Sequence, residues 1–181
     1  MLPDHPCNAC GNPGRPISRK TVLLMLKPGL LNCAQADYQF CATRNCAVVY
    51  FDRTGNHFQT DDLRVRVGIK EHDDPIPLCY CFGFNESHLR EFIADAGKTD
   101  VAQQIAALIG EGLCACESLN PAGTCCLGEV NRAMKRLREE FEALKVAIDR
   151  AIAAIENRDK DADSQLAELQ VRIGAIKVNT P

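Results

Sequence analysis

The residues best suited to chemistry in this sequence are its eleven cysteines, none of which lies beyond Cys126. The N-terminus has neither the basic stretch nor the apolar stretch of a secretory signal, so we expect a cytoplasmic protein. In a reducing compartment cysteines seldom form disulfides, and an odd number fits a disulfide framework poorly. Metal binding or redox chemistry is therefore their expected role.

Four cysteines near the N-terminus have the spacing of a zinc site. They form a CxxC knuckle and, about 30 residues later, a wider pair, as zinc sites built from two loops do: Cys7 with Cys10, and Cys41 with Cys46. Because zinc takes four ligands in a tetrahedron, this pattern predicts a zinc-ribbon-like Zn²⁺ site. Two unrelated buried pairs are the alternative, and His5 could replace one sulfur. Cys33 has no close partner and is expected to be a core or surface thiol.

The other six cysteines have a spacing that suits an iron–sulfur cluster. Four of them form two CxC pairs and the last two are adjacent. A CxC pair is unusual in zinc ribbons but could give two thiolates to one iron. A [2Fe–2S] cluster needs four thiolates, so spacing alone leaves open which of the six bind, and a second zinc site is the alternative. The six are Cys79, Cys81, Cys114, Cys116, Cys125 and Cys126.

The elements that position these cysteines indicate an α+β chain with three parts. Residues 1–74 are expected to form a small β-rich zinc-binding domain, because short apolar or alternating segments are separated by turn signals. We expect strands at 20–26, 38–41, 46–51 and 63–67. Residues 75–127 are expected to form a short helical [2Fe–2S]-binding domain, with Asn85 as the N-cap of its first helix.

The third part, residues 128–181, has a heptad pattern. Apolar or small residues recur in alternating steps of three and four from Leu127 to Ile155, and Leu166, Leu169 and Ile173 continue the phase. The unbroken phase favours one long helix, whereas aspartates at 159, 161 and 163 favour a turn and a helical hairpin. We expect the stripe to form a coiled-coil homodimer; packing on the rest of the same chain is the alternative.

Composition excludes several classes of function. The net charge is −3, so no global basic field exists to bind nucleic acid. No apolar run is long enough to span a membrane. The four histidines are scattered, and neither a phosphate-binding Gly-rich loop nor a GxSxG motif is present. A hydrolase or transferase is therefore poorly supported, and a metal-ion reductase or electron-transfer protein is the enzyme class left open.

Four sequence blocks resemble the N-terminal domain of CopZ-type copper chaperones. In chain order they are FC with CAVVYF (40–51), RVGIKE (66–71), PLCYCFGF (77–84) and CESLNPAGTCC (116–126). The resemblance covers about residues 5–130. It implies one zinc ion, one [2Fe–2S] cluster, a helical part similar to bacterioferritin-associated ferredoxin, and redox activity that reduces Cu(II) to Cu(I).

The resemblance also implies ligand sets. The cluster ligands would be Cys79, Cys81, Cys116 and Cys126, and the zinc ligands would be Cys7, Cys10, Cys41 and Cys46. Cys114 and Cys125 lie beside cluster ligands in the sequence. They are either accessory thiols that bind Cu⁺ or another soft metal transiently, or small packing residues.

One feature departs from that family. The full chaperone carries a C-terminal copper domain with an MxCxxC loop, and here a cysteine-free heptad segment follows Cys126. We therefore expect copper, or another soft metal, to be carried by a partner such as a copper chaperone or a metal-transport protein. Two other functions stay open: a metal- or redox-responsive interaction module that acts through the coiled coil, and a structural protein with two zinc sites.

Overall fold

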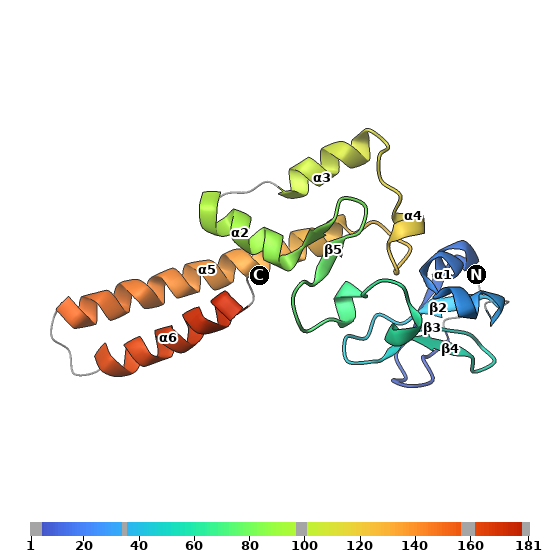
Figure 1. Ribbon diagram of the computed structural model, residues 1–181, viewed down its shortest axis with the longest axis horizontal. Helices are drawn as coiled ribbons and strands as arrows, with labels where there is room; N and C mark the ends of the chain where they lie inside the picture. Colours follow the sequence, from blue (N-terminus) through green and yellow to red (C-terminus); the bar gives the residue numbers. More distant parts are fainter. Residues whose placement is uncertain (1–4, 34–35, 97–100, 157–161, 179–181) are drawn as a thin grey trace.

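A computed structural model describes residues 5–33, 36–96, 101–156 and 162–178. It confirms the α+β class. Figure 1 shows a small sheet with helix α1 at one end of the molecule and two long helices, α5 and α6, extending toward the other. Shorter helices and a β-hairpin lie between them.

The N-terminal part is built on a four-stranded antiparallel sheet with strand order β1-β2-β3-β4. Its strands are β1 (Arg15–Ile17), β2 (Tyr38–Phe40), β3 (Val48–Phe51) and β4 (His57–Gln59). All four residues of β3 are buried, because Val49 and Tyr50 pack in the main core while Val48 and Phe51 pack against the N-terminal cysteines. Burial on both faces explains why this strand is an unbroken apolar run.

The strands predicted within 38–41 and 46–51 are confirmed, but the one predicted at 20–26 is wrong. That segment lies in helix α1 (Arg19–Met25), whose N-cap Ser18 accepts a hydrogen bond from the Thr21 amide at 3.0 Å. Val22, Met25 and the adjoining Leu26 are buried at helical spacing, which a short apolar run does not distinguish from a strand. The strand predicted at 63–67 is also wrong, because only an isolated bridge joins Leu63 to Leu26.

The middle part holds a small hairpin and three short helices. The hairpin pairs β5 (Pro77–Cys79) with β6 (Phe84–Asn85), and the helices are α2 (Glu86–Ala96), α3 (Val101–Gly110) and α4 (Cys116–Leu119). The predicted N-cap is confirmed, because the Asn85 side chain accepts the His88 amide at 2.9 Å. Three 3₁₀ turns complete the chain before residue 75: η1 (Pro28–Cys33), η2 (Thr60–Asp62) and η3 (Gly68–Lys70).

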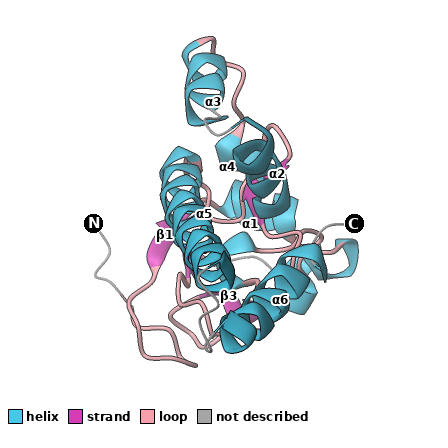
Figure 2. Ribbon diagram, turned by 90° about the vertical axis from the view of Figure 1, so that its left-hand side faces the viewer, coloured by secondary structure: helices cyan, strands magenta, loops and turns pink. Residues whose placement is uncertain are grey.

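The C-terminal part is a helical hairpin, so the expectation of one long helix is wrong. Helix α5 (Leu127–Glu156) packs against α2 and α3, and α6 (Ala162–Val178) folds back along its far half (Figures 1 and 2). The prediction of a turn rested on three aspartates: Asp159 and Asp161 lie outside the described residues, and Asp163 lies in the first turn of α6. No helix in the described part of the chain is long and apolar enough to cross a membrane.

Candidate metal centres

The four N-terminal cysteines converge on one point. The Sγ atoms of Cys7, Cys10, Cys41 and Cys46 all lie within 4.8 Å of one another. Cys7 Sγ is 4.0 Å from Cys46 Sγ, and Cys10 Sγ is 3.7 Å from Cys41 Sγ. A tetrahedron with metal–sulfur bonds of about 2.3 Å has edges of roughly 3.8 Å, so these separations fit a zinc ion.

Backbone geometry shapes each half of this site. In the first half, the Gly11 amide donates to the Cys7 carbonyl at 2.8 Å, and Gly11 has a φ of +72°, a conformation that glycine adopts without strain. In the second half, Cys41 follows β2, and its amide donates to the Val49 carbonyl of β3 at 2.8 Å. The sheet therefore fixes the loop that carries Cys41 and Cys46 against the knuckle.

The surroundings of the site also shift the pKa values of its thiols. A hydrogen bond between Cys10 and the Thr43 hydroxyl, whose oxygen lies 3.4 Å from the sulfur, is the largest of the causes that lower the pKa of Cys10 to about 6. Burial raises the pKa of Cys46 to about 12 and also raises that of Cys7. Sequence reasoning missed Thr43, whose position inside the second cysteine loop was the signal available for it.

Lys70 is a second residue that sequence reasoning missed. Its side chain is buried, with 7% of its surface exposed, and Nζ donates hydrogen bonds to the carbonyls of Cys46 at 2.9 Å and Thr43 at 3.0 Å. The ammonium therefore lies behind the loop that supplies two of the four sulfurs. The RVGIKE block contained this lysine, but nothing in its spacing to the cysteines indicated a contact.

The second cysteine set contains two pairs in contact. Cys81 Sγ lies 3.6 Å from Cys116 Sγ. Cys79 and Cys126 share a hydrogen bond, which lowers the pKa of Cys79 to about 6 and raises that of Cys126. Cys79, Cys116 and Cys126 are buried in the core formed by α2, α3 and α5. Each pair joins one cysteine of the Cys79–Cys81 segment to a later cysteine, which differs from the expectation that the CxC pair serves one iron. The four thiols are still the number that a two-iron cluster requires.

Three elements bring these pairs together. Cys79 ends β5 and Cys81 lies in the turn of the hairpin; Cys116 begins α4. Cys126 immediately precedes α5, where its carbonyl accepts the Val130 amide at 3.0 Å. The connection from Cys116 to Cys126 is shaped by Asn120, which is 7% exposed; its side chain donates to the Thr124 carbonyl and accepts the Ala122 amide.

The remaining predicted site residues have separate positions. Cys125 is exposed and lines, with Cys126, a hollow of about 360 Å³ between the sheet and α5, to which Arg15 and Arg44 also contribute. Cys114 is half-buried against the helical core. His5 does not belong to the four-sulfur group, and the Cys33 side chain lies outside the described residues.

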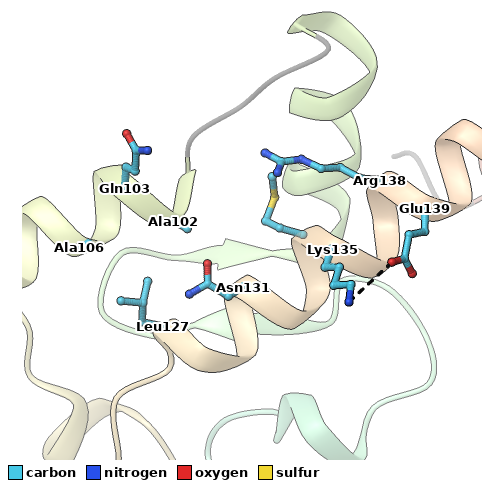
Figure 3. Close-up of a pocket in the computed structure, with 9 residues that line it drawn as sticks. Ala102, Gln103, Ala106, Leu127, Asn131, Lys135, Arg138 and Glu139 are labelled. Carbon is cyan, nitrogen blue, oxygen red and sulfur yellow. Dashed lines mark ion pairs between the residues drawn. The ribbon is translucent and has the colours of Figure 1, made fainter.

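A larger hollow, of about 540 Å³, lies in the groove between α3 and α5 (Figure 3). Ala102, Ala106 and Leu127 form its apolar lining, and Lys135 and Glu139 form an ion pair at its edge. It contains no cysteine or histidine.

Comparisons with known proteins agree with this geometry. A CopZ family model described as a zinc-binding domain matches residues 4–64, which contain all four N-terminal cysteines, and this match supports Zn²⁺ binding. The copper chaperone CopZ of Archaeoglobus fulgidus is 28% identical over 183 residues, which cover 96% of this chain and 87% of that protein. The X-ray structure of the Archaeoglobus fulgidus CopZ N-terminal domain is 32% identical in sequence and superimposes with a TM-score of 0.60. That match covers 71% of this chain and 96% of the chain in the X-ray structure. The chain therefore belongs to the CopZ family.

Proposed function

We propose that this chain is a zinc and iron–sulfur protein that transfers single electrons in the handling of copper or another soft metal. Cys7, Cys10, Cys41 and Cys46 hold zinc, and Cys79, Cys81, Cys116 and Cys126 hold a [2Fe–2S] cluster. The observation that carries the proposal is that each set of four cysteines comes together: four sulfurs lie within 4.8 Å of one another in the first, and in the second Cys81 Sγ lies 3.6 Å from Cys116 Sγ while Cys79 is hydrogen-bonded to Cys126.

The two sites divide the work. The zinc site is structural, because its four sulfurs complete the coordination and tie a sheet of short strands to the N-terminus. A cluster held at the second site would supply one-electron chemistry, the type needed to convert Cu(II) to Cu(I), the form that thiolates prefer. The surrounding protein buries three of the four thiols, and the Ala115 amide donates to Cys81 Sγ at 3.3 Å. Burial and amide hydrogen bonds of this kind set the potential of a cluster.

Neighbouring cysteines provide the decisive test. The protein is purified without oxygen, and iron, sulfide and zinc are counted on one sample together with the absorption spectrum. We expect two iron, two sulfide and one zinc per chain, as a [2Fe–2S] cluster and one zinc site require. Cys126→Ala should remove the iron, whereas the adjacent Cys125→Ala, which changes an exposed thiol, should leave it in place. A colourless chain with two zinc ions after attempted cluster reconstitution would leave a structural zinc protein instead.

Copper reduction is then measured directly. The reduced protein is mixed with Cu(II) under nitrogen, and Cu(I) is detected with a chromophoric Cu(I) chelator. One electron leaves the reduced cluster for each Cu(II) that becomes Cu(I). Free thiols also reduce Cu(II), as they form disulfides, so the Cys126→Ala protein gives the background. We expect the wild type to yield one Cu(I) per cluster above that background. Failure of the iron-loaded wild type to reduce Cu(II) would refute the redox role while leaving the metal content intact.

One observation favours a second candidate, a redox-responsive interaction module. Cys126 is a proposed cluster ligand, and the first turn of α5 begins on its carbonyl, which accepts the amides of Glu129 and Val130. A change at the second site would therefore act on the base of the longest helix. This candidate predicts that reduction changes the assembly state of the protein, which sedimentation of the oxidised and reduced forms measures.

A further inference from the structure

One short segment, residues 66–70, contacts both cysteine sites. At one end, the Lys70 ammonium donates to the carbonyls of Thr43 and Cys46, inside the loop of the N-terminal site. A buried ammonium is costly unless its hydrogen bonds are made, so these two bonds fix the lysine to that loop. Four thiolates around Zn²⁺ carry a net charge of −2, and the lysine lies where its positive charge offsets it.

At its other end, the same segment forms hydrogen bonds with the residue that lies between the first two cysteines of the second site. Tyr80 accepts a hydrogen bond from the Gly68 amide at 2.8 Å and donates one to the Arg66 carbonyl at 3.0 Å. Tyr80 stands between Cys79 and Cys81, and its position therefore affects both of their sulfurs.

The segment between these contacts is short and closely packed. Gly68 and Lys70 belong to the single turn η3, closed by the Lys70 amide donating to the Val67 carbonyl at 2.8 Å. A Cβ built at Gly68 would lie 1.8 Å from the Pro77 carbonyl oxygen, so the turn touches the backbone of β5 itself. No loose linker separates Lys70 from Tyr80, so a displacement of Lys70 also displaces Tyr80.

We propose that Lys70 and Tyr80 are positioning residues that couple the two cysteine sites, so that zinc bound at the first site holds the Cys79–Cys81 loop in its binding geometry. The inference rests on the zinc half of the proposed function and does not require iron. Coupling between two sites is reciprocal in binding free energy. Loosening Tyr80 must therefore weaken zinc binding at the first site, although Tyr80 is not one of its ligands.

Zinc affinity tests this consequence. Competition with a chromophoric chelator measures the zinc dissociation constant of the full-length chain without iron. Lys70→Met should weaken zinc binding about tenfold or more, as loss of a group that orients metal ligands does, and Lys70→Arg should restore most of it. Tyr80→Phe removes both hydrogen bonds of the phenol and should weaken zinc about two- to fivefold, because only part of that loss is transmitted to the zinc site. Lys27→Met is the matched control, because Lys27 also donates to a backbone carbonyl, that of Asp61, on the exposed surface.

The double variant separates coupling from two independent effects. If Lys70 carries the link, Lys70→Met with Tyr80→Phe should bind zinc no more weakly than Lys70→Met alone. Hydrogen exchange gives a second readout: in the zinc-loaded chain, Lys70→Met should speed exchange of the amides at 79–82. Where Lys70→Met fails to fold, Tyr80→Phe and Lys70→Arg still carry the test.

Each outcome identifies which idea fails. Unchanged zinc affinity in Tyr80→Phe, or additive losses in the double variant, would overturn the coupling and leave the zinc site standing. A wild-type chain that binds no zinc would overturn the zinc half of the proposed function and the coupling with it. The iron content enters neither comparison.

Discussion

Gly68→Ala should be among the most damaging single-methyl additions in this protein. The new Cβ would lie 1.8 Å from the Pro77 carbonyl oxygen, against an ordinary contact distance of at least 3.4 Å. The two backbones must therefore separate by about 1.6 Å, and overpacking of this kind costs about 1–3 kcal/mol. The same movement breaks the 2.8 Å bond from the Gly68 amide to Tyr80, which adds about 1 kcal/mol. We expect the free energy of unfolding to fall by about 2–4 kcal/mol, which lowers Tm by roughly 10 °C for a chain of this size.

Urea unfolding of the zinc-loaded protein measures this loss. Gly110→Ala is the matched control, because a Cβ there meets nothing within 4 Å, and alanine at the end of α3 should be neutral or slightly stabilising. If the free energy of unfolding of Gly68→Ala lies within about 0.5 kcal/mol of the wild-type value, residues 66–70 can accommodate the added methyl group by moving. The proposed link between the two cysteine sites would then lose its rigid element.

Three further predictions concern the cysteines. Cys41→Ser should reduce bound zinc from one ion per chain to nearly none, measured by metal analysis, because a four-sulfur site loses one ligand. In the metal-free chain the pKa of Cys10 is about 6, so the stability that its thiolate contributes is complete above the ordinary thiol pKa of about 8.5 and is lost as pH falls through about 6. Thr43→Val should move this loss to higher pH, which thiolate absorbance and a pH series of unfolding curves follow. Arg15→Glu should lower alkylation of Cys125 by anionic iodoacetate, relative to neutral iodoacetamide, about two- to threefold, because both residues line one hollow. An unchanged ratio of the two alkylation rates would show that the charge of Arg15 does not affect Cys125.

The N-terminal cysteine set could be predicted because its information is local. A CxxC knuckle and a second loop pair specify one tetrahedral site whatever the strands between them do. The sheet was harder, since β1 and β4 are three residues each and carry no clear alternation. The segment 20–26 misled for a related reason: its apolar run fits either period, and the Ser18 cap decided in favour of a helix.

The residues that join the two sites could not be predicted, because their contacts are made across long sequence separations. Lys70 lies 24 residues from Cys46 and reaches its carbonyl only once the η3 turn packs behind the loop. Tyr50 lies 71 residues from Pro121, yet its hydroxyl donates to that carbonyl at 2.7 Å. Each is a polar group whose partner is a backbone carbonyl, and backbone partners leave no mark in the sequence. The cysteines show which sites exist, whereas these bonds determine how the sites are held.

The C-terminal hairpin limits which heptad positions are left for a dimer interface. In the first half of α5, the heptad positions Val130, Met134 and Leu137 are buried in the core with α2 and α3, so the seam already has its partner there. In the far half, Ala151 is buried, whereas Ile152 and Ile155 remain 48% and 46% exposed. The predicted homodimer therefore has no need of the whole stripe and would involve this distal end of the hairpin. Ile155→Glu is the decisive test, because it places a charge at an exposed heptad position in that end, while the proposed metal sites lie at the other end. Sedimentation should then show a dimer that dissociates with its zinc content unchanged. A monomeric wild type would mean that the heptad pattern records packing within one chain, which is what the buried first half already shows for residues 130–137.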